Sequence, residues 1–273
     1  MLRPGAKTLV IGPGGGWDIS RALATGSKDV TGAEINPIIG TTIMREKYPQ
    51  LSQNLYLRPD VRINIEDGRS FVRRSPEKYQ VIQATLVDTW ASTAAGAFAL
   101  SENNLYTTDA FRDYFSHLTD DGVLTFTRWG FDPPRESLRL LSLAMTALKD
   151  LGETNPARHV IVGRLGGKSD LAGWGATDTV IFSRKPFTDA DVTRARQAFD
   201  EAHMSSVYLP GDGPVNTPSA SCCSPKTPPP TSAITSSTSP RSTTTGPSSS
   251  TPCNRATWPP SSSPPAANRP TAK

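Results

Sequence analysis

Three short signals in the N-terminal third of the chain combine residue types that bind ligands, and each follows an apolar run. The first is the glycine loop Gly12-Pro13-Gly14-Gly15-Gly16, the second is Glu34, and the third is Asp67 followed by Gly68. A glycine loop lets a ligand approach bare backbone, and the helix after it offers unpaired N–H groups. An acid at the end of the second run is placed to accept hydrogen bonds from two ribose hydroxyls, and an acid after the third run is placed to reach an adenine edge. Together these residues predict a pocket for an adenosine-containing cofactor.

The glycine loop alone is weak support, because a plain tight turn has the same composition. The dinucleotide fingerprint requires a further glycine at position 17, which is Trp17 in this chain. The order of the loop, Glu34 and Asp67 is more specific than any one of them. Asp67 favours an S-adenosyl-type ligand over a nicotinamide dinucleotide.

Candidate catalytic residues follow a fourth apolar run, Val81–Ala84. Asp88 lies just past this run, and a loop of small residues then leads to Glu102. Such a loop suits closure over a substrate, which makes Asp88 the first candidate for proton transfer and Glu102 the second. The alternative is a flexible connection in which Asp88 caps a turn.

Strands and helices that alternate along the chain would position these residues. The predicted strands are Thr8–Ile11, Asp29–Glu34, Val61–Ile65, Val81–Ala84, Val123–Thr127, Val160–Val162 and Thr179–Phe182. The predicted helices are Trp17–Ala24, Pro37–Tyr48, Ser70–Arg73, Thr108–His117, Ser137–Leu151 and Thr188–Ala202. This alternation predicts an α/β fold with a mostly parallel sheet covered on both faces. In such sheets ligands bind beyond the carboxyl ends of the strands, where all three signals fall.

The positive charge of the chain belongs to its C-terminal tail. Residues 215–273 hold five of the 29 basic residues and none of the 25 acidic ones, which leaves 24 basic and 25 acidic residues elsewhere, a net charge of −1. A near-neutral body suits an enzyme acting on small molecules, and we expect no nucleic-acid partner.

Metal and membrane sites are not expected. All three cysteines lie in the tail, and His117, His159 and His203 are far apart and match no ligand spacing. We interpret these histidines as ordinary surface or helix-end residues. No apolar run approaches the roughly 18 residues of a membrane span, and no signal peptide is evident, so a cytoplasmic location is expected.

Two regions are predicted, a folded domain over 1–214 and a tail over 215–273. The tail is dominated by Pro, Ser and Thr with almost no aliphatic residues, a composition that cannot bury a core and is typical of disorder. A shifted reading frame in a GC-rich gene gives the same composition, and this origin of the tail stays open as a hypothesis.

Taken together, the motifs resemble the spermidine synthase (polyamine aminopropyltransferase) family. The similar stretches are Gly12–Gly16, Glu34, Glu66-Asp67-Gly68, Tyr79–Ile82, Asp88 and Leu105-Tyr106-Thr107, and the bacterial spermidine-synthase-like domains often attached to membrane segments are the most alike. The resemblance implies a class I methyltransferase-like fold of seven strands, the last antiparallel. It also implies decarboxylated S-adenosylmethionine, or S-adenosylmethionine, as donor. Glu34 would hold its ribose, Asp67 and Gly68 its adenine side, and the loop Gly12, Gly14, Gly15 and Gly16 its sulfonium end.

The chain departs from the family where the acceptor would bind. The family has an Asp-x-x-Asp-Pro element after the fourth strand; here Thr85 replaces the first acid, Asp88 keeps the second and Thr89 replaces the proline. The first acid of the family assists the attacking amine. We also expect the family's small N-terminal β-domain to be absent, because this chain starts almost at the first predicted strand.

Three functions therefore remain as hypotheses. The first is aminopropyl transfer to a small-molecule amine, with Asp88, Thr85 and Glu102 on the acceptor side. The second is S-adenosylmethionine-dependent methyl transfer on the same fold, and the third is non-catalytic nucleotide binding. A homodimer is left open.

Overall fold

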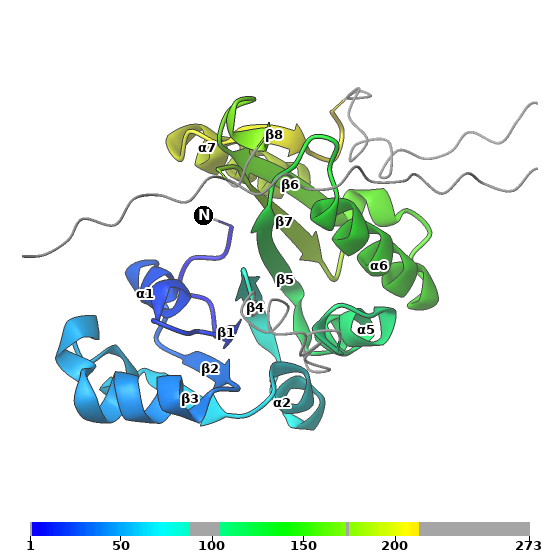
Figure 1. Ribbon diagram of the computed structural model, residues 1–273. Helices are drawn as coiled ribbons and strands as arrows, with labels where there is room; N and C mark the ends of the chain where they lie inside the picture. Colours follow the sequence, from blue (N-terminus) through cyan, green and yellow to red (C-terminus); the bar gives the residue numbers. More distant parts are fainter. Residues whose placement is uncertain (1, 88–103, 173–174, 213–273) are drawn as a thin grey trace, which may run out of the picture. The chain divides into compact units, whose positions relative to one another are not determined.

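An eight-stranded sheet runs through the part of the chain that the structure describes, residues 2–87, 104–172 and 175–212 of a computed structural model (Figure 1). The strands are β1 (Thr8–Ile11), β2 (Val30–Glu34), β3 (Val61–Ile65), β4 (Tyr79–Thr85), β5 (Leu118–Trp129), β6 (Val160–Leu165), β7 (Thr177–Ser183) and β8 (Ser205–Tyr208). Their order across the sheet is β3-β2-β1-β4-β5-β7-β6-β8. The predicted α/β class and mostly parallel sheet are confirmed.

The strand directions divide the sheet into two parts. Strands β3, β2, β1, β4 and β5 are parallel neighbours, while β7 pairs antiparallel with both β5 and β6. Seven strands with an antiparallel β7 were expected, and β7 matches that expectation. The eighth strand was not predicted; β8 pairs antiparallel with the outer edge of β6.

The helical segments fall between the strands as the alternation predicts. They are α1 (Trp17–Ala24), η1 (Ile38–Lys47), η2 (Pro49–Ser52), η3 (Leu55–Leu57), α2 (Gly68–Arg74), α5 (Thr108–Ser116), α6 (Glu136–Asp150), η4 (Pro156–His159), η5 (Asp170–Ala172) and α7 (Asp189–Glu201). Side chains cap several of them: Asp67 begins α2, Thr107 begins α5, and Thr188 forms a capping box with Asp191 at α7.

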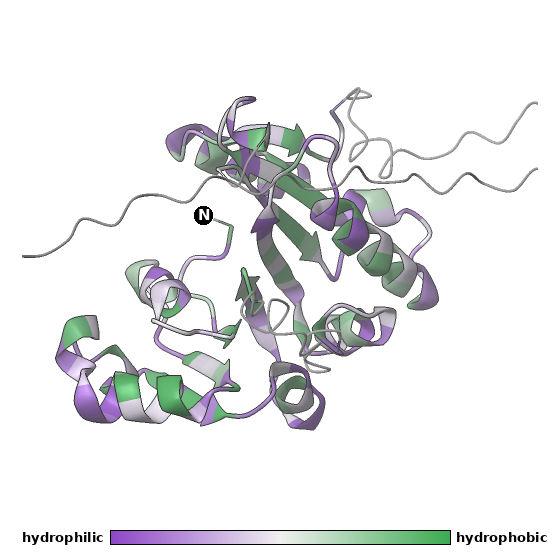
Figure 2. Cartoon of the chain, viewed as in Figure 1, coloured by the Kyte–Doolittle hydropathy of each residue, from purple (hydrophilic) through white to green (hydrophobic). Residues whose placement is uncertain are grey.

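Helices α2, α5 and α6 cover one face of the sheet and enclose the main core. Phe111 of α5 lies at its centre with no exposed surface, and its ring packs against Tyr114, Phe126 and Phe182 with centroids 5.4–6.0 Å apart. Figure 2 shows hydrophobic residues along β6 and β7 beneath these helices. This core fixes the positions of β4 and β5, and the predicted acceptor side of the site lies at the end of β4.

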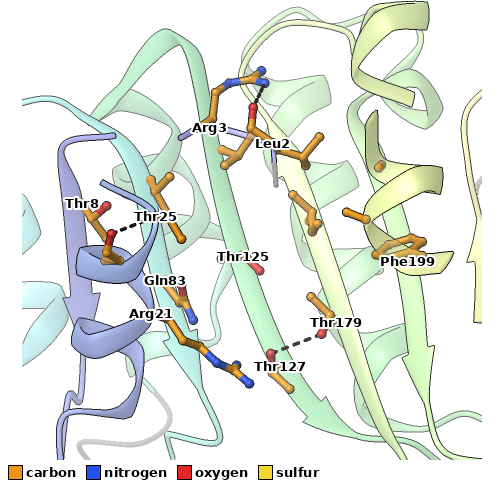
Figure 3. Close-up of a pocket in the computed structure, with 16 residues that line it drawn as sticks. Leu2, Arg3, Thr8, Arg21, Thr25, Gln83, Thr125, Thr127, Thr179 and Phe199 are labelled. Carbon is orange, nitrogen blue, oxygen red and sulfur yellow. Dashed lines mark hydrogen bonds between the residues drawn. The ribbon is translucent and has the colours of Figure 1, made fainter. Parts of the chain in front are cut away.

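The opposite face is covered in two places. Helix α1 and the segments η1 and η3 pack on β1, β2 and β3, and α7 packs on β5 and β6. Between α1 and α7 the sheet lines a cavity of about 270 Å³. Figure 3 shows Gln83, Thr125, Thr127 and Thr179 of the sheet facing it, with Arg21 of α1 and Phe199 of α7 on its two sides.

Two details differ from the sequence-based expectations. The helix predicted over Pro37–Tyr48 is a wider π-helix, η1, in which the Tyr48 N–H reaches back five residues to the Ile43 carbonyl at 3.0 Å. His159 is a helix-end residue, since it ends η4, but it is not on the surface: it is fully buried, and its Nδ1 lies 3.0 Å from the Ser183 carbonyl oxygen.

No helix among the described residues is both long and apolar enough to cross a membrane, and no three His, Cys, Asp or Glu side chains among them are grouped to hold a metal ion.

Replacing Phe111 by alanine tests the main core. Removing a fully buried ring leaves a cavity, so Phe111→Ala should lower the free energy of unfolding by about 3–5 kcal/mol. The matched control is Leu51→Ala, because Leu51 is 80% exposed and its truncation should change stability by less than about 0.5 kcal/mol. Urea denaturation measures both, and equal effects would contradict the packing described here.

Candidate functional site

The three predicted signals meet at one edge of the sheet. Glycine 12 follows β1 and its N–H donates to the Ala33 carbonyl of β2 at 2.9 Å, while the Glu66 N–H after β3 donates to the Glu34 carbonyl at 2.9 Å. These bonds place the ends of β1, β2 and β3 side by side. The carboxyl edge of the parallel strands is where such folds bind ligands.

Glu34 holds the glycine loop. Its side chain ends β2 and is only 4% exposed, with Oε2 accepting from the Gly14 N–H at 3.0 Å and Oε1 accepting from the Asn36 N–H at 2.9 Å. Each carboxylate oxygen has two lone pairs, so both oxygens keep acceptor capacity after these bonds. The arrangement fits a nucleoside whose ribose hydroxyls donate to Glu34.

Tyr56 is a loop-holding residue that the sequence analysis missed. It lies in η3, is 2% exposed, and donates its hydroxyl to the Gly14 carbonyl at 2.7 Å. Burial, with a smaller contribution from the charge of Glu34, raises the pKa of the Tyr56 phenol, so the hydroxyl stays protonated as the donor. Glu34 and Tyr56 thus bind the N–H and the carbonyl of the same residue, Gly14.

The loop backbone needs glycine at its two ends. Gly12 has a φ of +65° and Gly16, which precedes α1, has a φ of +87°, values that side chains rarely tolerate. Beside Gly15 no heavy atom lies within 4 Å of where a side chain would begin. The backbone of Gly15 is therefore open to a ligand.

Asp67 has a structural task in addition to its predicted binding role. Its Oδ1 accepts from the Ser70 N–H at 2.9 Å and so caps α2. Gly68 is buried against Ile11 of β1, since an added Cβ would lie 2.4 Å from the Ile11 Cγ2. This close packing explains why position 68 is a glycine. The predicted contacts of Gly68 and Asp67 with a cofactor stay predictions.

The end of β4 lies next to the glycine loop. Thr85 is its last residue, and two residues later the Val87 side chain packs so tightly on Gly12 that an added Cβ would lie 2.9 Å from it. The Tyr106 hydroxyl then donates to the Val87 carbonyl at 3.2 Å. Asp88 and Glu102, the two predicted acids, lie outside the described residues, so their roles remain predictions.

Arg128 and Glu136 were not predicted and border the same edge. The Arg128 side chain is 11% exposed, donates to Glu136 at 2.7 Å and to the Tyr106 hydroxyl at 3.2 Å, and stacks over the Tyr106 ring. Arg128 is the next-to-last residue of β5, so its bond to Tyr106 ties the segment before α5 to the sheet. No spacing in the sequence marks this cluster, because its members lie on three separate segments: the bend before α5, strand β5 and helix α6.

The cavity between α1 and α7 is a separate feature. Its lining includes none of the glycine-loop residues and neither Glu34 nor Asp67. It is therefore distinct from the nucleoside edge.

Comparisons with known proteins give distant structural similarity. No protein-family model matches the sequence, and no curated protein matches it. Similar solved structures include a spermidine synthase in complex with the transition state analogue AdoDATO, at 18% identity and a TM-score of 0.47 over 70% of this chain and 57% of that chain. They also include the spermidine synthase of Thermotoga maritima, at 18% identity and a TM-score of 0.48 over 70% of this chain and 58% of that chain.

A third similar structure is a ribosomal protein L11 methylase from Lactobacillus delbrueckii subsp. bulgaricus. It matches at 17% identity and a TM-score of 0.41 over 68% of this chain and 73% of that chain. The present chain spans less than two thirds of both spermidine synthases. Its strand order and antiparallel β7 give it a methyltransferase-like α/β fold.

Glu34→Gln tests the nucleoside edge. The amide keeps the shape but loses a charged acceptor that Gly14 and a ribose would share, so the affinity for an adenosyl donor should fall by about 1.5–3 kcal/mol. Glu46→Gln is the control, because Glu46 is exposed on η1. Isothermal calorimetry measures both variants, and an unchanged affinity in Glu34→Gln would remove Glu34 from the site.

Proposed function

We propose that this chain binds decarboxylated S-adenosylmethionine and transfers its aminopropyl group to a small-molecule amine. The observation that carries the proposal is the buried Glu34 carboxylate bonded to the glycine loop, with Asp67 after the neighbouring strand. An acid at the end of a strand can accept the ribose hydroxyls of an adenosine-containing ligand, and a glycine loop beside it lets that ligand approach the backbone. The motif resemblance supports the choice of an aminopropyl donor.

Binding and orientation would supply most of the rate. Glu34 accepts the two ribose hydroxyls, Asp67 keeps Oδ2 for the adenine amino group after Oδ1 has capped α2, and Gly15 offers open backbone toward the sulfonium end. Holding the donor carbon against the amine turns a bimolecular displacement into an effectively unimolecular one. The Val87 contact with Gly12 joins this donor edge to the end of β4.

The chemical step is a displacement at carbon. The amine lone pair forms a C–N bond, the C–S bond breaks with its electron pair going to sulfur, and methylthioadenosine leaves. The new ammonium then gives a proton to a base. In this proposal Asp88 accepts that proton, and Glu102 is the next candidate.

Methyl transfer is the second candidate, and Thr85 is the observation that favours it. A hydroxyl stands at the end of β4 where the aminopropyltransferase family has an acid. Both functions use the same fold, so the donor that binds distinguishes them.

Thermal unfolding with a panel of donors separates the candidates. Decarboxylated S-adenosylmethionine at about 100 times its dissociation constant should stabilise the protein by roughly 2.7 kcal/mol. A response to S-adenosylmethionine alone would favour methyl transfer. No response to either donor, nor to methylthioadenosine, would overturn nucleoside binding itself.

Asp88→Asn tests the chemical step. If Asp88 is the base, its replacement should leave donor affinity unchanged and lower kcat/KM for the amine by roughly 10²- to 10⁴-fold. Release of methylthioadenosine measures turnover. Full activity in this variant would move the role to Glu102, which Glu102→Gln would then test by the same measurement.

A further inference from the structure

Asp18 is a buried carboxylate that the proposed chemistry does not yet use. It lies in the first turn of α1, two residues after the glycine loop, and is 5% exposed. Its Oδ1 is fully buried and has no hydrogen-bond partner among the described residues. Burying an acid with an unmade bond is costly, so such a group is retained only where something offsets that cost.

The neighbours of Asp18 lie at the end of β4. Gln83 and Thr85 point to the α1 face of the sheet, since the alternate residues Ile82 and Ala84 belong to the core on the other face. Gln83 Nε2 donates to the Thr85 Oγ1 at 3.3 Å. Burial raises the pKa of Asp18, and the Thr85 hydroxyl, the Arg21 charge and the Gln83 amide each oppose that rise. Arg21, three residues after Asp18 on α1, and Gln83 line the same cavity, so α1 lies beside the end of β4 where Gln83 bonds Thr85.

Thr85 occupies the position at which the aminopropyltransferase family places an acid, and Asp18 is beside it. We propose that Asp18 is a positioning residue that supplies, through the Thr85 hydroxyl, the negative charge that orients a cationic or polar amine acceptor. This inference rests on the proposed function. It assigns the binding of the acceptor amine to two residues, Asp18 of α1 and Thr85 of β4, in place of a single acid on β4.

The proposed arrangement leaves Asp18 ionised throughout the reaction. In this proposal Thr85 would donate its O–H to the Asp18 carboxylate while its oxygen accepts an N–H of the amine, because a hydroxyl has one donor and two acceptor lone pairs. The second lone pair takes the Gln83 amide. Hydrogen bonding to an ionised partner strengthens the acceptor side of the hydroxyl. In the displacement the product ammonium still gives its proton to the base named under the proposed function, and not to Asp18.

Variants that remove the acid from Asp18 or place it at position 85 test this pair. In the full chain, Asp18→Asn and Thr85→Val should each lower kcat/KM for 1,4-diaminobutane by roughly 10- to 100-fold with donor affinity unchanged. Thr85→Ser keeps the hydroxyl and should keep activity. The double change Asp18→Asn with Thr85→Asp puts the acid back on β4 and should recover the activity lost in Asp18→Asn.

Binding of 1,4-diaminobutane to protein loaded with methylthioadenosine gives a second readout that needs no turnover. The same variants should weaken it by the same factor, and the double variant should restore it. Asp200→Asn is the matched control, because Asp200 is exposed on α7, away from the site. Melting temperatures of all variants show that each is folded.

The outcomes separate this inference from the proposed function. If the wild-type chain binds the donor but neither binds nor alkylates the diamine, aminopropyl transfer fails and the role of Asp18 fails with it. If the wild type alkylates the diamine while Asp18→Asn keeps full activity and diamine affinity, the function stands and the inference is wrong. Loss in Asp18→Asn without recovery in the double variant would assign Asp18 a purely structural role.

Discussion

The site depends on the bond between the Glu34 carboxylate and the backbone of Gly14. A glycine loop has no side chains to fix its shape, and here a charged acceptor on its N–H and the Tyr56 phenol on its carbonyl fix it from both sides. Glu34 is positioned by β2, Tyr56 by η3 and the glycine loop by β1. These three elements must therefore pack together correctly for the pocket to form. The same contact couples ligand binding to loop order, because the carboxylate that holds the loop is also the one proposed to hold the ribose.

The α/β sheet provides this register through its two covered faces. The core under α2, α5 and α6 fixes β4 against β5, and the smaller cluster under α1 and η3 fixes β1 to β3. The donor edge and the end of β4 are then joined by the contact of Val87 with Gly12. Asp18 lies where these parts meet, since α1 begins at the glycine loop and packs beside Gln83 and Thr85.

Local patterns in the sequence predicted the elements with strong flanking signals. The bounds of β1, β3 and α1 agree to the residue, because an apolar run or a glycine loop marks each of their ends. Strand β8 was missed, since Ser205–Tyr208 begins with two polar residues and has only a short apolar stretch. A helix was expected where η1 lies, but not a π-helix, because no spacing of its residues indicated the wider form.

The same limit applies to the site. Glu34 and Asp67 are predictable because each lies at or just past the end of a strand: Glu34 is the last residue of β2, and Asp67 is two residues past β3. Tyr56 is not, because its partner Gly14 is 42 residues away and only the packing of η3 brings them together. Asp18 has the appearance of an ordinary first-turn acid until β4 places Thr85 beside it. Single-residue signals are local, whereas these roles come from contacts between elements.

The central claim is that the ends of β1, β2 and β3 form an adenosyl-nucleoside site, and a crystal structure with methylthioadenosine tests it most directly. The account predicts both ribose hydroxyls within hydrogen-bond distance of the Glu34 carboxylate, the adenine beside Asp67, and the thioether over Gly15 facing the end of β4. A nucleoside bound elsewhere, such as in the cavity between α1 and α7, or a ribose without contact to Glu34, would contradict it.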